Sequence, residues 1–451
     1  MNYKNIGKDK LNEGIDLLVK LINIDSVLTK FDPSSDAPFG EGNKKALNLL
    51  LDTAKKDGFT TKNVSNFAGH IEYGAKDGEI VGVLAHLDVV PVNRTNWASD
   101  PFKAVVTKNR IIGRGSTDDK GPLVASYMAI KAIKESGLPV TKRVRLIAGC
   151  DEETGSRGLS KYFTEEKMPN VAFSPDADWP LIYGEKAITS FDINGSFKDS
   201  IVETFESGKV YNMVPDTAYM TLSENLVKEY LTFLKVHNYK GEIIGKKYYA
   251  YGLSAHGSMP QIGNNAVFIL AEFLEEFSSC EFSRYVVSYL KNSPYGEKLG
   301  IDVDGKDMGN LTCNLGFVKT NKSNFTLGIN LRIPVDNYKD LIIEKLEKSF
   351  SDFKSLSHTK IDVEPIHYVD PSSDLVKTLL DAYTSITGDI DAKPKTIGGG
   401  TYAKFIKNCV AFGPETDGKD NFIHNANEFI DLEDFETAIA IYTKAIYELI
   451  K

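Results

Sequence analysis

The chain has 451 residues and a mass of 49.9 kDa, more than one hydrophobic core usually organises, so we expect two domains. Hydrophobic residues make up 42% of it and charged residues 25%, which is typical of a globular protein and excludes a disordered one. The net charge of -9 and the isoelectric point near 5.5 argue against a phosphate-binding surface, so we expect no nucleic acid partner.

The sequence also lacks the signals of export and membrane insertion. Its first residues, Met1 to Gly14, are polar and charged, and no later stretch has the uncharged apolar length that spans a bilayer. We therefore expect a cytoplasmic protein that binds no membrane. The cysteines are scattered without CxxC spacing, so we expect reduced thiols that lie mostly in the core: Cys150, Cys280, Cys313 and Cys409.

The first part of the chain alternates between helix-like and strand-like patterns. Apolar residues recur at helical spacing over residues 11–22, and a second helix face follows Pro122 and ends at Gly137. Short, nearly continuous apolar runs predict buried parallel strands at residues 80–85, 144–148 and 171–173. This alternation predicts an α/β layered sheet with helices on both faces, which we assign to a first domain that begins with residues 1–185.

The pattern changes near Lys186. Strand-like and helix-like patches then mix without strict alternation, which predicts an inserted α+β domain over residues 186–385. The last part, residues 386–451, contains a glycine-rich turn, an apolar run at residues 409–412 and a helix that ends near Leu449. We expect this part to return to the first domain.

Potential metal ligands follow each of the predicted parallel strands. His86-Leu87-Asp88 comes after the first strand, Asp151-Glu152-Glu153 after the second and Ser174-Pro175-Asp176 after the third. Asp118-Asp119 precedes the predicted helix between the first two strands, and His424 follows the last apolar run. Because open α/β sheets bind ligands beyond the carboxyl ends of their strands, these side chains should converge. Imidazole and carboxylate groups are zinc ligands, and a catalytic zinc site keeps one position open for water.

These residues belong to longer motifs that recur in a fixed order. Four lie in the first part of the chain: His86-Leu87-Asp88-Val89-Val90-Pro91, Gly113-Arg114-Gly115-Ser116-Thr117-Asp118-Asp119-Lys120-Gly121-Pro122, Asp151-Glu152-Glu153-Thr154-Gly155 and Phe173-Ser174-Pro175-Asp176-Ala177. The others follow later: Tyr211-Asn212-Met213-Val214-Pro215, Ser254-Ala255-His256-Gly257-Ser258-Met259-Pro260, Gly398-Gly399-Gly400-Thr401 and His424 within Phe422-Ile423-His424-Asn425-Ala426-Asn427-Glu428. Together they resemble the M20 metallopeptidase family, and within it bacterial dipeptidases of the peptidase V (Xaa-His dipeptidase) type. The resemblance implies a catalytic domain from residues 1–185 and 386–451 and a lid domain from residues 186–385.

This resemblance implies two divalent metal ions per chain, Zn²⁺ in the first place, with Mn²⁺ or Co²⁺ as alternatives. Asp118 would bridge the two ions, with His86 and Asp176 on one and Glu153 and His424 on the other. Three carboxylates and a bridging hydroxide carry about four negative charges, which two divalent ions neutralise in a buried site.

The resemblance also implies roles in catalysis and substrate binding. Glu152 corresponds to the general base, and Asp88 to the carboxylate that orients the His86 ring. His256 corresponds to the lid histidine that polarises the scissile carbonyl. The substrate-binding residues that it implies are Asn212, Arg332, Gly399 and Thr401. A structural turn histidine at His256 and a surface ion pair at Arg332 are the alternatives that the sequence leaves open.

We expect hydrolysis of the amide bond of dipeptides by a metal-activated bridging water, in a monomer with a long lid domain. An N-acyl amino acid deacylase is the alternative enzyme, because members of the family share the metal site and differ mainly in the lid. A non-catalytic binding protein on the same fold is the alternative outside enzymes. Such a protein would be expected to lose a ligand or the base, whereas all five ligand positions and the base are present here.

Overall fold

The computed structural model describes residues 1–198, 200–416 and 418–451, and it divides into two compact units. The first unit consists of Met1–Gly184, His367–Lys395 and Thr401–Lys451. The second unit consists of Glu185–Ile366 together with Thr396–Gly400. Each unit has a hydrophobic core of its own, as separate domains require.

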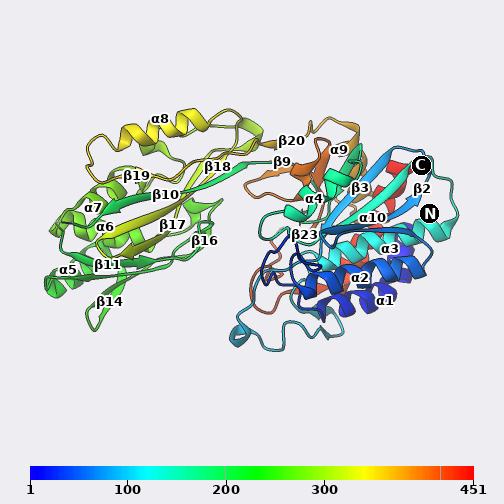
Figure 1. The fold of residues 1–451 in the computed structure, drawn as a ribbon, viewed down its shortest axis with the longest axis horizontal. Helices are drawn as coiled ribbons and strands as arrows, with labels where there is room; N and C mark the ends of the chain where they lie inside the picture. The colour runs from blue at the N-terminus through cyan, green and yellow to red at the C-terminus, as the bar shows by residue number, and fades with distance from the viewer. Residues whose placement is uncertain (199, 417) are drawn as a thin grey trace. The chain divides into compact units, whose positions relative to one another are not determined.

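A nine-stranded sheet forms the centre of the first unit (Figure 1). Its strands are ordered β1 (Thr60–Val64), β2 (Ala68–Gly74), β6 (Arg143–Gly149), β3 (Ile80–His86), β7 (Val171–Ser174), β22 (Cys409–Ala411), β9 (Ile182–Glu185) and β20 (His367–Tyr368), with β21 (Lys395–Ile397) paired to β9. The run β6, β3, β7 and β22 is parallel, so the carboxyl ends of these strands meet at one edge. An open α/β sheet binds its ligands at such an edge.

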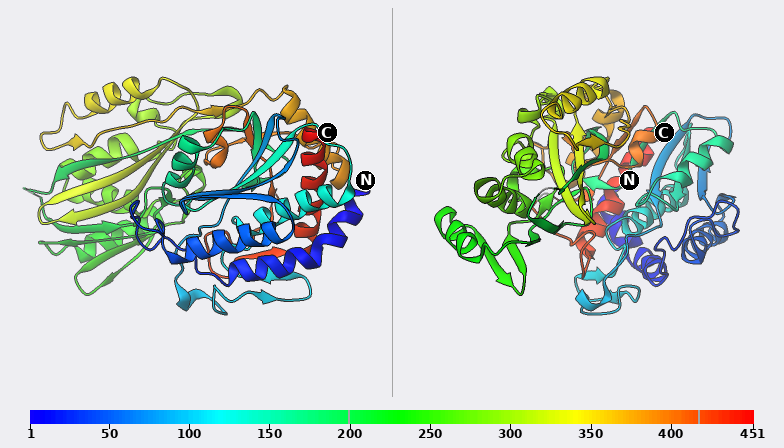
Figure 2. Two further views of the ribbon diagram at one scale, coloured as in Figure 1. Left: turned by 45° about the vertical axis from the view of Figure 1, so that its right-hand side comes forward. Right: turned by 60° about the vertical axis from the view of Figure 1, so that its left-hand side comes forward.

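Helices cover both faces of this sheet, because successive side chains of a strand point to opposite faces. Val81, Val83 and Ala85 of β3 belong to a core that is completed by α1 (Tyr3–Ile22), α2 (Glu41–Lys56), α3 (Lys120–Ser136), α9 (Asp374–Thr387) and α10 (Leu432–Ile450). Leu84 of the same strand belongs to a second core, with α4 (Arg157–Glu165) and the 3-10 helix η6 (Tyr402–Phe405). The first and last helices, blue and red, lie side by side (Figures 1 and 2). The predicted α/β layered sheet with helices on both faces is confirmed.

Two small sheets tie together segments of the first unit that are far apart in the sequence. One contains β4 (Val105–Val106), β5 (Arg110–Ile112) and β24 (Phe429–Asp431), and the other contains β8 (Ala177–Asp178) and β23 (Pro414–Glu415). The first joins the segment that leads to Asp118 with the segment that follows His424. The second joins the segment after Asp176 with the segment before His424. Both small sheets therefore help to bring the candidate ligands together.

The second unit is an α+β arrangement built on an antiparallel sheet. Its eight strands are ordered β14 (Lys240–Ile244), β15 (Lys247–Tyr251), β13 (Thr217–Leu222), β11 (Val202–Ser207), β17 (Thr312–Asn321), β18 (Asn324–Ile333), β10 (Ala187–Ser196) and β19 (Ser357–His358). Its α-helices are α5 (Val227–His237), α6 (Ala266–Phe277), α7 (Glu281–Tyr285) and α8 (Lys339–Ser349), and the π-helix η3 (Val286–Leu290) follows α7. Met220 of β13 and Ala250 of β15 share one core with Phe233 of α5. A separate ladder joins β12 (Met213–Val214) to β16 (Ala255–His256).

The inserted segment ends earlier than the predicted residue 385. The helix α9 (Asp374–Thr387) belongs to the first unit, because Leu375, Val376, Leu379, Ala382 and Ile386 are buried in the core of that unit. The sequence places the glycine-rich turn in the first domain, whereas Thr396–Gly400 belongs to the second unit of the structure. Two hydrogen bonds hold it there: Thr396 Oγ1 donates to the Asp307 carbonyl at 2.7 Å, and Arg332 Nη1 donates to the Gly398 carbonyl at 2.8 Å.

The cysteines lie mostly in the core, as the sequence predicts. All four cysteines are free thiols, and Cys150, Cys313 and Cys409 are buried.

Over residues 1–198, 200–416 and 418–451, none of the helices combines the length and the apolar character needed to cross a bilayer.

Candidate metal centre

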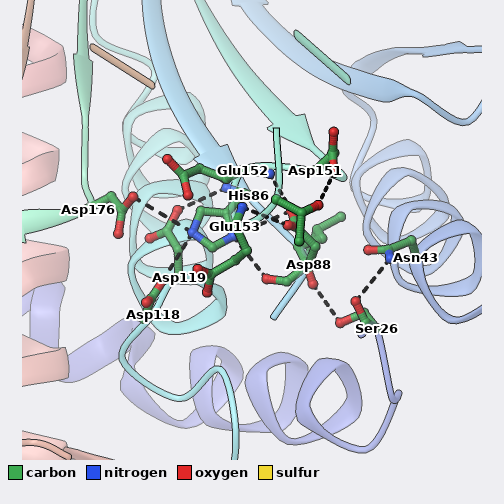
Figure 3. A network of polar contacts seen from close by, with 12 residues as sticks. Ser26, Asn43, His86, Asp88, Asp118, Asp119, Asp151, Glu152, Glu153 and Asp176 are labelled. Carbon is green, nitrogen blue, oxygen red and sulfur yellow. Dashed lines mark hydrogen bonds and ion pairs between the residues drawn. The ribbon is translucent and has the colours of Figure 1, made fainter. Parts of the chain in front are cut away.

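The candidate ligands lie at the carboxyl edge of the parallel strands. His86 is the last residue of β3, Asp176 comes two residues after β7, and Glu153 comes four residues after β6. Asp118 lies just before α3, and His424 lies in the loop between β23 and β24. Figure 3 shows the side chains of the first four pointing toward one another. The edge that the strand order predicts as a ligand site is thus occupied by imidazole and carboxylate groups.

These five side chains form two clusters that share Asp118. In the first cluster, Nε2 of His86 lies 3.0 Å from Oδ1 of Asp118 and 3.7 Å from Oδ2 of Asp176. In the second, Nε2 of His424 lies 2.8 Å from Oδ2 of Asp118 and 3.2 Å from Oε2 of Glu153. Within each cluster the ligand atoms lie within 4.8 Å of one another. The two oxygens of Asp118 thus face different histidines, which is the geometry of a bridging carboxylate.

Two potential metal-binding atoms of the clusters lack hydrogen-bond partners although they are buried. Among the residues that the structure describes, neither Nε2 of His86 nor Oε1 of Glu153 has a hydrogen-bond partner. The other ring nitrogen of His86, Nδ1, donates to the Asp88 carbonyl at 2.9 Å, which leaves Nε2 with a lone pair for a metal ion. Unsatisfied buried nitrogen and oxygen atoms of this kind suit a divalent cation such as Zn²⁺.

The carboxyl groups of the centre disfavour one another's ionisation. Burial raises the pKa of Asp176 and of Glu153, and the negative charge of Asp118 raises both further. Burial also raises the pKa of Glu152 to about 8, with His86 opposing the shift and Glu153 adding to it. A positive charge among these groups would relieve the repulsion, because an opposite charge favours the ionised carboxylate.

Protons on the two histidines can supply such a charge. Burial acts to lower the pKa of His424, but Asp118 and Glu153 outweigh it and raise that pKa to about 11. Burial is likewise outweighed at His86, whose pKa is raised well above its usual value by Asp118 and Asp176. Histidine binds metal ions as the neutral base, so a cation would take the place of a proton at each cluster. The donor set therefore fits one divalent cation in each.

Asp88 has different partners from those expected. Its carboxylate lies 3.6 Å from Nδ1 of His86, whereas its own backbone carbonyl is the 2.9 Å acceptor of that ring nitrogen. The carboxylate instead accepts the backbone N–H groups of Glu152 at 3.0 Å and Glu153 at 3.1 Å. Asp88 therefore holds the turn that carries the two glutamates, and the His86 ring is oriented by main chain.

Glu152 belongs to neither cluster of candidate ligands. It follows Asp151 in the turn after β6, and its side chain is partly buried. In Figure 3 it stands among His86, Asp119 and Glu153. A carboxylate that lies beside the candidate ligands without being one of them is free to exchange protons.

The second unit brings two of its predicted site residues, Asn212 and His256, into one region. Met213 of β12 pairs with His256 of β16, and the Asn212 carbonyl accepts the N–H of Gly257 at 2.7 Å. Nδ1 of His256 lies 2.6 Å from Oγ of Ser258. Ser258 in turn packs against Gly398, where an added Cβ would come within 2.7 Å of the serine Cβ. Ser258, which sequence reasoning had not singled out, stands two residues after His256 in the same motif.

Arg332 of β18 is a buried guanidinium, not a member of a surface ion pair. It is 4% exposed, and its Nε and Nη1 donate to the Asn330 side chain at 2.9 Å and the Gly398 carbonyl at 2.8 Å. Within the part of the chain that the structure describes, no acidic side chain forms an ion pair with it, and burial lowers its pKa to about 10. A buried charge without a counter-charge is costly, and it marks a place suited to an anion.

The two remaining substrate-binding candidates lie on either side of the point in the chain where a segment of the second unit ends and a segment of the first unit begins. Gly399 lies in Thr396–Gly400 of the second unit, beside the carbonyl that Arg332 contacts. Thr401 begins the next segment of the first unit, where its hydroxyl accepts the N–H of Ala403 at 3.0 Å and caps η6. The structure thus gives Thr401 a capping role.

A sequence profile of peptidase family M20/M25/M40 matches residues 82–448. The chain belongs to this family. The match includes the candidate ligands from His86 to His424 and most of both compact units. The predicted membership of the M20 family is therefore confirmed.

Named relatives and solved structures agree with this assignment. A Bacillus subtilis protein named "Putative dipeptidase YtjP" is 38% identical, with 96% of each chain covered. Human carnosine dipeptidase 1 has a TM-score of 0.60 at 14% identity, with 99% of each chain covered. Dug1p of Saccharomyces cerevisiae, described as a di-peptidase, has a TM-score of 0.61 at 17% identity over 99% of this chain and 98% of the yeast chain. At these identities the two structures show that the M20 fold is shared.

The hydrogen bonds of Asp88 predict that its carboxylate supports metal binding in this M20 family member. Asp88→Asn should weaken Zn²⁺ binding about 10- to 100-fold, because one of the two N–H groups of the glutamate turn loses its acceptor. Ser26→Ala is the matched control, since the Ser26 hydroxyl donates to the neighbouring Leu87 carbonyl at 2.6 Å and, among the described residues, forms no hydrogen bond with that turn. Calorimetric titration with Zn²⁺ would measure both variants. Wild-type affinity in Asp88→Asn would show that the carboxylate does not hold the turn.

Proposed function

We propose that the protein is a dipeptidase that hydrolyses the amide bond of its substrate with two divalent cations. The observation that carries the proposal is the position of Asp118, whose two oxygens lie 3.0 Å from His86 and 2.8 Å from His424. One cation would be held by His86, Asp118 and Asp176, and the other by Asp118, Glu153 and His424. Zn²⁺ is the cation that this mixture of imidazole and carboxylate ligands favours first, with Mn²⁺ and Co²⁺ as alternatives.

Glu152 is the general base in this proposal. Cations held at the two clusters would supply Lewis acidity, which makes the attacking water molecule more acidic. Glu152 accepts a proton from that water while the water oxygen bonds to the carbonyl carbon of the substrate. The same carboxyl group then gives the proton to the leaving nitrogen as the C–N bond breaks, which regenerates the carboxylate and leaves a carboxylic acid and an amine.

The second unit supplies recognition of the substrate carboxylate in this proposal. The guanidinium of Arg332 is buried without an acidic partner among the described residues, and Thr312 is its direct neighbour on β17. The hydroxyl of Thr312 is also buried and, over the described part of the chain, has no hydrogen-bond partner. A carboxylate bound there would satisfy both groups at once. Arg332 therefore binds the C-terminal carboxylate of the substrate, with the Thr312 hydroxyl as a second hydrogen-bond donor.

His256 and Asn212 are the remaining groups that the proposal assigns to the substrate. The imidazole of His256 is oriented by the Ser258 hydroxyl at 2.6 Å, so its Nε2 can serve as a hydrogen-bond donor. It would stabilise the negative charge that develops on the scissile carbonyl oxygen. Asn212, whose carbonyl holds Gly257, would add a side-chain amide contact beside it, and Gly399 a backbone N–H group.

A dipeptide is the substrate that this assignment favours. In a dipeptide a single residue separates the scissile carbonyl from the C-terminal carboxylate, so recognition of the first group at the cations and of the second at Arg332 would select substrates of this length. The relatives named as dipeptidases support the same size class. An N-acyl amino acid would also present a carboxylate, so the two substrate classes differ only at the other end, where a dipeptide carries a free amine.

The role of Glu152 predicts a variant that binds metal and does not turn over. Glu152→Gln should lower kcat for dipeptide hydrolysis by at least about a hundredfold, because a proton carrier of this kind contributes 10²–10⁴-fold. Its content of Zn²⁺ should stay at the wild-type level, since Glu152 belongs to neither ligand cluster. Steady-state kinetics and metal analysis on the same preparation would test both parts. A kcat above about a tenth of wild type would assign the proton transfer to another group.

The role of Arg332 predicts a dependence on the substrate carboxylate. Wild type should hydrolyse a dipeptide faster than its C-terminal amide, faster than its tetrapeptide extension and faster than the matching N-acetyl amino acid. Arg332→Met should lower kcat/KM for the dipeptide and leave the already slow amide unaffected, since the amide has no carboxylate to bind. The Zn²⁺ content of Arg332→Met should match wild type. An equal loss on dipeptide and amide would show that Arg332 has a purely structural role.

A further inference from the structure

A buried carboxylate outside the ligand set holds the loop that carries Asp118. Glu428 is fully buried and accepts four hydrogen bonds, all of them from that loop. Its Oε1 accepts the N–H groups of Thr117 at 2.9 Å and Asp118 at 3.1 Å. Its Oε2 accepts the N–H of Gly115 at 3.1 Å and Nη1 of Arg114 at 2.6 Å. The loop therefore wraps its backbone donors around one negative charge, as in a backbone nest for an anion.

The main chain around Glu428 reinforces the same contact. The carbonyl of Glu428 accepts the N–H of Gly113 at 2.9 Å, and the next residue, Phe429, pairs with Ile112 between β24 and β5. The Phe429 carbonyl also accepts the hydroxyl of Thr117 at 2.7 Å. Both ends of the loop that leads to Asp118 are thus fixed against one short segment of chain.

The same segment begins with the loop of His424. Arg114, which pairs with Glu428, donates through Nη2 to the Asn425 carbonyl at 3.1 Å. The backbone has positive φ at His424 (60°) and at Asn427 (65°), a conformation that side-chain-bearing residues adopt when their surroundings hold them in it. Glu428 ends this loop four residues after His424. One ion pair thus touches the loops of two candidate ligands.

The stability that this ion pair adds does not explain why it is there. Arg114 is 2% exposed and Glu428 0%, so both charges lose their hydration, and such a pair adds little or nothing to stability compared with apolar side chains of the same size. What it does provide is fixed geometry, because each remaining lone pair of the carboxylate faces a backbone donor. A network of this kind specifies where the loop atoms lie.

We infer that Glu428 is a positioning residue of the metal centre, which fixes the backbone of Asp118 directly and the loop of His424 through Arg114. It sets the separation of the two ligands that meet at 2.8 Å in the second cluster. The inference rests on the proposed two-cation function, because it assigns Glu428 to the binding of those cations. Glu428 itself belongs to neither cluster of candidate ligands.

The test compares two carboxylates of the first unit that each pair with a buried arginine, the fully buried Glu428 and the partly buried Glu72. Glu428→Gln keeps the size of the side chain but turns an amide N–H₂ toward donors that need an acceptor. Glu72→Gln is the matched control, because Glu72 of β2 pairs with Arg145 at 2.7 Å and, within the described part of the chain, forms no hydrogen bond or ion pair with a candidate ligand. Calorimetric titration of the metal-free proteins with Zn²⁺ would give the number of ions and the Kd of each. Thermal unfolding of the same metal-free samples would report their stability.

We expect the Kd for Zn²⁺ to rise about 10- to 100-fold in Glu428→Gln and to stay near wild type in Glu72→Gln, at similar losses of melting temperature. Excess Zn²⁺ should restore dipeptide hydrolysis by Glu428→Gln. Two Zn²⁺ ions bound by Glu428→Gln as tightly as by wild type would overturn this inference and leave the proposed function standing. A wild-type protein that binds no Zn²⁺ would overturn both.

A second variant decides the matter if Glu428→Gln does not fold. Arg114→Lys keeps a positive charge toward Glu428 but cannot also reach the Asn425 carbonyl, so it loosens the His424 loop alone. A several-fold rise in the Kd for Zn²⁺ would support the inference. Wild-type affinity in folded Arg114→Lys would overturn it.

Discussion

The repulsion among the carboxylates around Asp118 is the interaction on which the architecture of the first unit depends. Asp118, Glu153 and Asp176 are brought close together at one sheet edge, and burial removes the water that would otherwise screen them. Such a group of acids is stable only when positive charge is supplied among them. Protons on the two histidines can supply it, and divalent cations would supply it more strongly. A site that costs stability in this way has to be held together by the rest of the fold.

The fold holds it through hydrogen bonds to the main chain of the turns that carry the ligands. The carboxylate of Asp88 holds the turn of Glu153, and that of Glu428 holds the loop of Asp118. Asp151 secures the far side of the glutamate turn, because it is buried and accepts the N–H and the Nε of Arg157 at 3.0 and 2.6 Å. These charge-assisted hydrogen bonds fix where the turns lie although the ligands repel one another. Carboxylate side chains that are not candidate ligands thus position the carboxylate side chains that are.

Much of the fold and of the candidate site could be predicted from the sequence, because both depend on local patterns. Strands buried on both faces are apolar at every position, as in residues 80–85, and the residue that follows such a strand lies at the ligand-binding edge. The end of the insertion could not be predicted, since the apolar face of α9 fits either core equally well by sequence alone. The hydrogen-bond partners of Asp88 and Glu428 could not be predicted either. Both carboxylates accept backbone N–H groups, and such bonds leave no pattern of side-chain types in the sequence.

The central claim is that Asp118 is shared by two cations, and the number of ions bound by three variants tests it most directly. Wild type should bind two Zn²⁺ ions per chain in a calorimetric titration of the metal-free protein. His86→Ala and His424→Ala should each lose one tight site, whereas Asp118→Ala should lose both, because its oxygens belong to both clusters. An Asp118→Ala protein that is folded and still binds one or two Zn²⁺ ions with wild-type affinity would contradict the account.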